Sequence, residues 1–279
     1  MTTLSNPMDT KFPTPGRGSA STTTHTQGNF RISTRKLPIS KAGPISEMEA
    51  KLRIPVPEMI FGDNMVAIEH VPSGWSIEFN AFDALNGVEK TAKNMLQVSY
   101  ARDWSSSRET SNSHVHEVVK PYDWSYTTPY SGTLDAKSAA MMQEGKTLIP
   151  LELLKRRDPI LFFEDVVLYE SELDDNGISL YSVKVRVHEK RMLLLARLFM
   201  RLDNVLVRIR DTRVYVDFET DKVIREYTIN EAPFDSVKQS LLRSGRLPDE
   251  ITMSLRDSNI IASLMKPIDG KLDEVNLKK

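Results

Sequence analysis

Residues 195–228 read LARLFMRLDNVLVRIRDTRVYVDFETDKVIREYT, and apolar and charged residues alternate through most of this stretch. A period of two is typical of a half-buried β-strand. The alternation is interrupted at Asp203-Asn204 and at Thr220-Asp221, residue types that two-residue hairpin turns favour. The stretch therefore predicts three antiparallel strands, with four arginines projecting from an apolar base: Arg201, Arg208, Arg210 and Arg213.

The rest of the chain adds more strands than helices. Residues 65–70 and 75–79 alternate around a Pro-Ser-Gly turn and predict a hairpin. Further strands are expected at 30–39, 95–101, 115–119, 160–168, 181–188 and 193–202. Helical spacing predicts helices at 45–53, 82–88, 149–157, 236–244 and 258–265.

The composition excludes several classes of protein. The chain has 279 residues, 40% hydrophobic and 27% charged, which suits one large globular domain or two small ones. Lys and Arg number 37 against 38 Asp and Glu, so no basic excess indicates binding to nucleic acid. The chain has no cysteine, which excludes disulfides, thiol catalysis and zinc sites built on Cys.

The ends of the chain and its hydropathy define the expected boundaries. Residues 1–27 are rich in Thr, Ser, Pro and Gly and poor in apolar residues, so we expect them to be disordered. A globular domain is expected over 28–268 and a flexible tail over 269–279. No apolar run approaches the roughly 18 residues needed to span a bilayer. The expected location is the cytoplasm, with the nucleus left open, and no membrane partner is expected.

Three patterns resemble catalytic or metal-binding motifs but fit them poorly. Residues 140–147, AMMQEGKT, satisfy a relaxed phosphate-loop pattern, yet no apolar strand precedes them and the Glu would repel phosphate. Residues 172–177 mimic the start of a calcium loop, but Val183 stands where a bidentate Glu is required. His114 and His116 lack an evident third ligand. We therefore expect no catalytic residue, cofactor or metal.

Several segments resemble one known family, the TIPRL (TOR signalling pathway regulator-like) proteins. The resemblance runs in order over roughly residues 30–230. It rests on PEMIFGDN (57–64), IEFNAFDAL (77–85), KPYDWSYTTPYSGTL (120–134), PILFFEDVVLYESELDDNGISLYSVKVRV (159–187), LLARLFMRLDNVLVRIRDTR (194–213) and REYT (225–228). The chain departs from the family in its Thr/Ser-rich N-terminus, in the charged residues 188–191 and in its last 45 residues.

The resemblance implies a single-domain α+β fold, with antiparallel β-sheets built of hairpins and meanders and with peripheral helices around a central cleft. It implies a cytosolic regulator without enzymatic activity. Such a regulator binds the catalytic subunit of type 2A protein phosphatases, modulates it with inhibition as the expected effect, and acts in TOR nutrient signalling. A phosphatase-associated regulatory subunit of the TOR pathway is a second candidate partner.

The resemblance also implies four partner-binding residues, Asp83, Ile149, Ile209 and Asp211. Each has an alternative structural role. Asp83 suits a helix cap, Asp211 suits a local pair with Arg213, and the two isoleucines suit the core. Asp83 and Asp211 are expected to share one surface. Two other functions stay open: a signalling scaffold acting through the N-terminus, and a nucleotide-dependent enzyme using residues 140–147.

Overall fold

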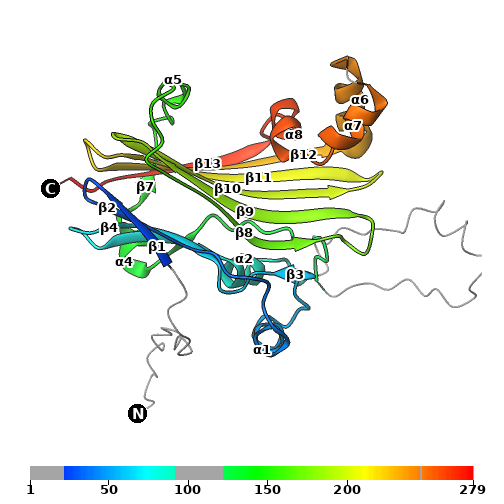
Figure 1. Cartoon of the computed structure of the whole chain (residues 1–279), viewed down its shortest axis with the longest axis horizontal. Helices are drawn as coiled ribbons and strands as arrows, with labels where there is room; N and C mark the ends of the chain where they lie inside the picture. Colours follow the sequence, from blue (N-terminus) through cyan, green and yellow to red (C-terminus); the bar gives the residue numbers. More distant parts are fainter. Residues whose placement is uncertain (1–21, 92–121, 246, 279) are drawn as a thin grey trace, which may run out of the picture.

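The computed structural model describes residues 22–91, 122–245 and 247–278. Two antiparallel β-sheets pack face to face, and short helices lie at their periphery (Figure 1). This arrangement confirms the expected α+β class built on antiparallel sheets.

The larger sheet has eight strands in the order β3-β8-β9-β10-β11-β12-β13-β7. Its centre is a meander in which each strand pairs with the next along the chain. The strands are Met59–Ile60 (β3), Gln143–Glu144 (β7), Phe162–Ser171 (β8), Gly177–Val187 (β9), Arg191–Leu202 (β10), Leu206–Asp217 (β11), Lys222–Pro233 (β12) and Asp269–Asn276 (β13).

The stretch 195–228 forms most of β10, β11 and β12, which confirms the three predicted strands. Both hairpin turns lie where the sequence predicts them, but each is longer than two residues. The first spans 203–205 and the second 218–221. Asn204 and Asp221 have φ angles of 61° and 52°, a left-handed conformation that Asn and Asp tolerate better than most residues.

The smaller sheet has five strands in the order β1-β2-β4-β5-β6. The predicted hairpin at 65–80 forms β4 and β5, and the first two strands of the chain continue the sheet from β4. The strands are Thr22–Gln27 (β1), Phe30–Arg35 (β2), Met65–His70 (β4), Trp75–Asn80 (β5) and Thr133–Leu134 (β6).

The main hydrophobic core fills the space between the sheets. Alternate residues of each strand point into it, as Ile77 and Phe79 do from β5 and Leu194 and Leu198 from β10. The aromatic segment 122–132 joins this core. Tyr169 and Tyr181 of the larger sheet donate hydrogen bonds to the Tyr126 and Tyr130 carbonyls, at 2.9 and 3.2 Å.

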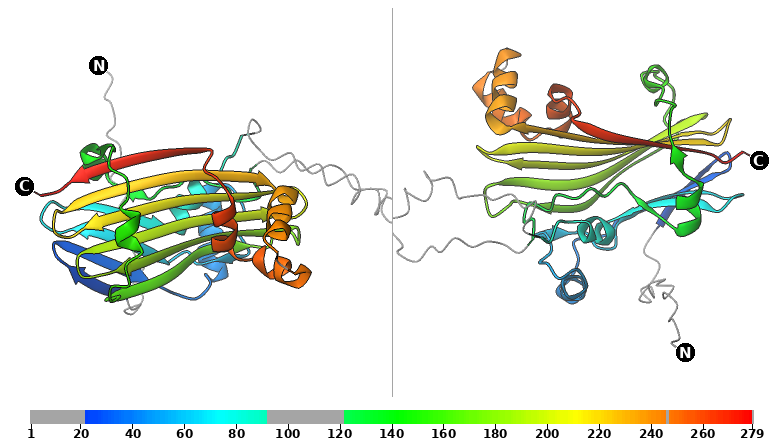
Figure 2. Two further views of the ribbon diagram at one scale, coloured as in Figure 1. Left: turned by 90° about the horizontal axis from the view of Figure 1, so that it is seen from above. Right: turned by 180° about the vertical axis from the view of Figure 1, so that it is seen from behind.

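The helices fall into two groups, with α5, α6, α7 and α8 on the larger sheet and α1, α2 and α4 beside the smaller sheet (Figure 1). Figure 2 shows α5 and the trio α6, α7 and α8 over opposite ends of one face of the larger sheet. That face points away from the smaller sheet, and we call it the outer face. The helices are Ala42–Leu52 (α1), Ala81–Asn86 (α2), Ala136–Met141 (α4), Leu151–Leu154 (α5), Phe234–Arg243 (α6), Pro248–Ser254 (α7) and Ser258–Leu264 (α8).

Three expectations differ from the structure. Residues 22–27, expected to be disordered, form β1, because a polar strand gains its hydrogen bonds from β2 without burying apolar surface. Residues 269–276, expected to be a flexible tail, form β13 between β12 and β7. The helix expected at 149–157 is reduced to α5. The strands expected at 95–101 and 115–119, and His114 and His116, lie outside the described residues.

Candidate functional site

Three of the four residues implied by the resemblance belong to the outer face of the larger sheet. The register of β9 to β12 aligns the side chains of this face in rows across the strands. One row contains the apolar Leu193, Tyr215 and Ile224, with Arg186 of β9 beside Leu193. The next row is mostly charged, with Lys184, Leu195, Arg213 and Glu226. The following rows contain Arg197 with Asp211, and then Phe199 with Ile209.

Ile149 lies at the apolar end of the outer face. It is buried against Tyr215 and Ile224, with Leu154 of α5 packed beside it. Ile149 thus holds down the segment 146–157, which carries α5 and which we call the α5 arm. Because its side chain is covered, Ile149 can support a partner surface but does not itself present one.

Ile209 lies at the opposite end of the outer face, under the helix trio. It is almost fully buried in a second hydrophobic cluster. At this end of the outer face, β10 and β11 also carry apolar side chains, and α6, α7 and α8 cover them. The cluster contains Phe199, Val207, Ile209, Phe234, Val237, Leu241, Ile251, Leu255 and Ile261.

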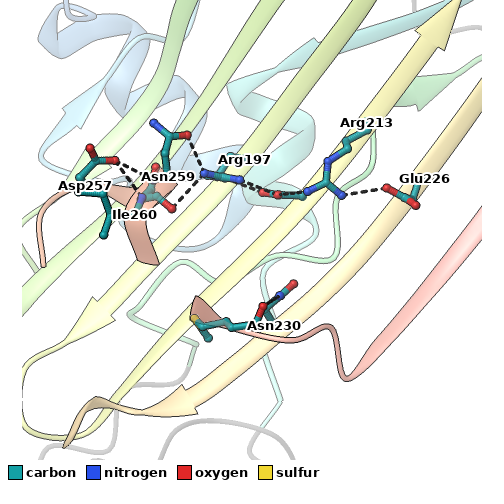
Figure 3. A network of polar contacts seen from close by, with 10 residues as sticks. Arg197, Arg213, Glu226, Asn230, Asp257, Asn259 and Ile260 are labelled. Atoms are coloured by element: carbon teal, nitrogen blue, oxygen red, sulfur yellow. Dashed lines mark hydrogen bonds and ion pairs between the residues drawn. The ribbon is translucent and has the colours of Figure 1, made fainter. Parts of the chain in front are cut away.

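Asp211 lies between these two ends and is the centre of a buried polar network. Figure 3 shows Arg197 and Arg213 of this network. Its two carboxylate oxygens accept hydrogen bonds from Nε and Nη2 of Arg197, both at 2.7 Å. Arg213 donates a third at 2.8 Å and reaches Glu226 at 2.9 Å with its other nitrogen. Such two-pronged arginine–carboxylate pairs fix geometry as well as contributing energy.

The same network fixes helix α8 on the sheet. Arg197 Nη1 donates to the Ser258 carbonyl at 3.1 Å and to Asn259 Oδ1 at 3.0 Å, at the start of α8. Asn230 of β12 donates to the Met265 carbonyl at 3.4 Å, at the end of α8 (Figure 3). Asp211 is 2% exposed, so its carboxylate is not directly accessible to a partner.

Asp83 lies on the other side of the molecule. It is in the first turn of α2, where its backbone N–H donates to the N-cap residue Asn80. Its carboxylate accepts from Asn80 Nδ2 at 2.9 Å and from Thr133 Oγ1 at 2.5 Å. Asn80 and Thr133 alternate with the inward-facing Phe79 and Leu134, so Asp83 faces away from the core on the smaller sheet.

The structure therefore does not place Asp83 and Asp211 on one surface, contrary to our expectation. The two sheets and the main core separate them. The expectation failed because sequence spacing does not show which sheet a strand joins, and the two segments belong to different sheets.

The arginines of the opening stretch form internal ion pairs, as the interleaved aspartates suggest. Arg201 pairs with Asp203 at 2.6 Å and Arg213 pairs with Asp211. They do not all project on one side, because Arg208 and Arg210 occupy the alternate positions of β11. Arg197 is the functional residue that the sequence reasoning missed. It lies seven residues before Asn204, and Asp211 lies seven after it, so a turn centred on Asn204 pairs them.

The phosphate-loop pattern at 140–147 has the wrong geometry for nucleotide. It begins at the end of helix α4 and continues as the short strand β7, whereas a phosphate loop joins a strand to a following helix. The N–H of Gly145 donates to the Leu272 carbonyl at 2.8 Å and is not available to a phosphate.

The calcium-like segment is equally unsuited, because it forms the turn between β8 and β9. Among residues 22–91, 122–245 and 247–278, no group of three or more His, Asp or Glu is placed to hold a metal ion. In the same part of the chain, no helix has the length and apolar character needed to cross a membrane.

A hollow lies between α7 and α8, beside the outer face. It has a volume of about 740 Å³ and opens to solvent. Its lining combines acidic and apolar side chains, including Asp249, Glu250, Met253, Asp257 and Ile260. The outer face thus ends in an acidic region at α7 and α8.

Comparisons with known proteins agree on one family. The model of the TIP41-like family matches residues 59–238, more than half of the chain. A human TIP41-like protein is 42% identical over 230 residues, covering 82% of this chain and 84% of the relative. The type 2A phosphatase activator TIP41 of Saccharomyces cerevisiae is 40% identical over 251 residues, covering 84% and 69%.

A third relative extends the match to nearly the whole chain. The type 2A phosphatase activator tip41 of Schizosaccharomyces pombe is 31% identical over 247 residues, covering 88% of this chain and 95% of the relative. These matches confirm the resemblance drawn from the sequence.

Proposed function

The chain belongs to the TIP41-like family, and from this premise we propose that it is a non-enzymatic regulator that binds the catalytic subunit of type 2A protein phosphatases. The observation that carries the proposal is the pair of yeast relatives whose names specify a type 2A phosphatase, aligned over 84% and 88% of this chain. Asp83, Ile149, Ile209 and Asp211 are proposed as residues on which binding depends.

The geometry supports the outer face as the main binding surface. Ile149 supports the α5 arm at one end, and Ile209 with Asp211 supports the helix trio at the other. Ile149 is far from Ile209 and Asp211, which lie in neighbouring rows of the sheet. Each residue supports an element that projects from the same face (Figure 2). A partner that contacts both elements is sensitive to all three residues. Asp83 then belongs to a second contact region on the smaller sheet.

The direction of the effect is part of the proposal. We propose that the direct complex with the catalytic subunit is inhibited, in the setting of TOR nutrient signalling in the cytoplasm. The two yeast relatives are named activators, which gives the opposite sign. A phosphatase-associated regulatory subunit of the TOR pathway is the second proposed partner.

Binding and sign are tested together with purified components. The full-length chain is titrated against a type 2A catalytic subunit, with affinity measured by calorimetry and phosphatase activity measured on a phosphopeptide. We expect a saturable complex and a fall in activity with the same midpoint. A rise in activity would reverse the proposed sign while leaving the partner in place. The absence of a complex at micromolar concentrations would reject the partner itself.

A further inference from the structure

The α5 arm, residues 146–157, is fixed to the sheet at both ends. Before it, β7 pairs with β13 through Glu144 and Asp273. Lys222 then donates to Thr147 Oγ1 at 2.6 Å, and the Thr147 N–H donates to Glu274 at 3.2 Å. The Thr147 side chain beside Glu274 is the main reason that the pKa of the Glu274 carboxyl lies below its usual value, and Lys222 and the Thr147 N–H act in the same direction.

The far end of the arm is fixed as firmly. Asp158 pairs with the buried Arg191 at 2.5 Å, and His188 Nδ1 lies 2.9 Å from the Pro159 carbonyl. Between the two ends, Ile149 packs into the outer face. The arm is therefore a loop whose position is set, although α5 itself spans only Leu151–Leu154.

The outer side of the arm presents apolar side chains to solvent. Leu148 is 73% exposed and Leu151 is 62% exposed. Phe163, on the outer face of β8, is half-exposed, but Arg186 of β9 separates it from Leu193 in the same row. Leu148 and Leu151 lie three residues apart on a loop whose position is fixed. Their exposure does not stabilise the isolated fold, and exposed apolar side chains held in place in this way are typical of interaction sites.

The same part of the arm is cationic. Lys155 pairs with Glu152 within the arm at 2.7 Å. Lys146, Arg156 and Arg157 are exposed and form no ion pair with any other residue in the described part of the chain. Two exposed leucines bordered by three unpaired cations are complementary to an apolar pocket with an acidic rim.

From this placement we propose that the α5 arm is a direct contact element, which inserts Leu148 and Leu151 into an acid-rimmed apolar pocket on the phosphatase catalytic subunit. This assignment rests on the proposed function. It divides the roles on the outer face: the leucines and arginines of the arm touch the partner, and Ile149 positions them.

An anionic lipid surface shares the basic and apolar chemistry but fits the arm less well. Interfacial membrane helices bury a long apolar face, whereas α5 is one turn long and turns Leu154 towards the sheet. Glu152 and Asp158 also place carboxylates beside the cations. A protein pocket is therefore the favoured occupant.

The test uses the full-length chain, a purified type 2A catalytic subunit and two arm variants, Leu148→Asn/Leu151→Asn and Arg156→Glu/Arg157→Glu. The controls lie away from the outer face. They are Ile39→Asn/Val71→Asn, whose side chains are about half-exposed, and Lys41→Glu/Arg53→Glu at the two ends of α1. We expect both arm variants to weaken binding about tenfold or more, as anchor residues do. The defect of the charge variant should shrink at high ionic strength, because salt screens exposed charges. All variants should unfold at the wild-type temperature.

The outcomes separate this inference from the proposed function. If the wild type binds and the arm variants bind as well as the controls do, the arm is not a contact and the function stands. If the wild type does not bind, both proposals fall. Sedimentation with phosphatidylserine vesicles that requires Arg156 and Arg157, together with unchanged phosphatase affinity, would assign the arm to lipid instead.

A crosslinking measurement tests the chemistry of the pocket directly. A benzophenone amino acid replaces Leu151, and the crosslinked peptide of the catalytic subunit is identified by mass spectrometry. We expect the adduct in an apolar region flanked by Asp and Glu. An adduct flanked by Lys and Arg contradicts the proposal.

Discussion

Arg225 of β12 and Asp273 of β13 form a mostly buried ion pair, with Nη2 of the arginine 2.7 Å from Oδ2 of the aspartate. The second nitrogen of the Arg225 guanidinium reaches the Ser131 carbonyl at 3.4 Å. The pair therefore ties the last strand of the chain to the central meander and to the segment that runs between the sheets.

The first prediction concerns this pair and the last strand. Asp273→Ala leaves the Arg225 charge buried and unpaired, so we expect a loss of about 3–5 kcal/mol in the free energy of unfolding. Lys271→Ala is the matched control, because Lys271 also contacts Asp273, at 3.1 Å, but is well exposed. Its cost should stay below about 1 kcal/mol. Urea unfolding measures both, and equal small effects would show that β13 contributes little to stability.

The second prediction concerns the buried network under α8. Arg197→Met should destabilise the protein by about 3–5 kcal/mol, because Asp211 loses its two-pronged partner. The double variant Arg197→Met/Asp211→Leu should be less destabilised than Arg197→Met, since no buried charge remains. Hydrogen exchange should rise in α8, residues 258–264, in both variants. Unchanged exchange there would separate the network from the position of the helix.

The third prediction concerns Asp83 and Asp211 as independent contributors. Asp83→Leu and Asp211→Asn should each weaken phosphatase binding about tenfold, because each change removes a charge on which the interface depends. The two sites lie on opposite sides of a two-sheet sandwich, whose layers are about 10 Å apart, so their effects should add within about 0.5 kcal/mol. A double-mutant cycle measures the coupling. Strong coupling would place both residues under one contact surface.

The fourth prediction concerns pH and His70. Burial lowers the pKa of the His70 imidazole below 6.5, although Asp221, 3.7 Å from its Nε2, acts in the opposite direction. Ser73 forms a hydrogen bond with the His70 ring, and Asn29 donates a hydrogen bond to the Asp221 carboxylate. The unfolded state therefore binds the proton more readily, and this contribution to stability is full above pH 6.5 and is lost as the pH falls below it.

The matched variant for this pH effect is His70→Gln, which removes the titrating group. We expect urea unfolding of the wild type to weaken between pH 7.5 and 5.5 by more than that of the variant. A variant with the same pH slope as the wild type would assign the dependence to other groups.

The fifth prediction concerns nucleotide. Mg-ATP should leave the unfolding temperature of the protein unchanged, because the Gly145 N–H is already used by Leu272 and a helix, not a strand, precedes the pattern. Lys146→Ala should respond in the same way. A stabilisation by Mg-ATP that Lys146→Ala abolishes would restore the nucleotide-dependent alternative.

The local elements of the sheets were largely predictable, because a period of two reports on strands directly. Residues 195–228 and 65–80 gave their strands and the positions of their turns. The sequence did not predict that β1 pairs with β2 or that β13 pairs with β12. Neither strand carries a strong apolar alternation, since one is Thr-rich and the other is charged, and both depend on a neighbouring strand edge.

The candidate site was predictable only in part, for a related reason. Sequence similarity implied Asp83, Ile149, Ile209 and Asp211 as partner-binding residues but did not show their burial. Asp211 and Ile209 occupy alternate positions of β11, on the outer face of the larger sheet. They are buried only because α6, α7 and α8 pack over that face. Leu148 and Leu151 are exposed because Ile149 packs against the sheet between them. The local sequence does not predict where Ile149 packs.

The edges of the two sheets bear on how the protein avoids self-association. Long strands such as β9 to β12 would template foreign strands if they ended a sheet. Here the larger sheet ends in β3 and β7, which have two residues each, and the smaller sheet ends in the two-residue β6 and the polar β1. Each two-residue strand covers only two residues of the strand beside it, and the remaining edge strand, β1, carries Thr, His and Gln side chains. On the larger sheet, β13 pairs with residues 222–229 of β12. Loss of β13 would turn this stretch of the meander into an unpaired edge, which is where aggregation of β-sheet proteins starts.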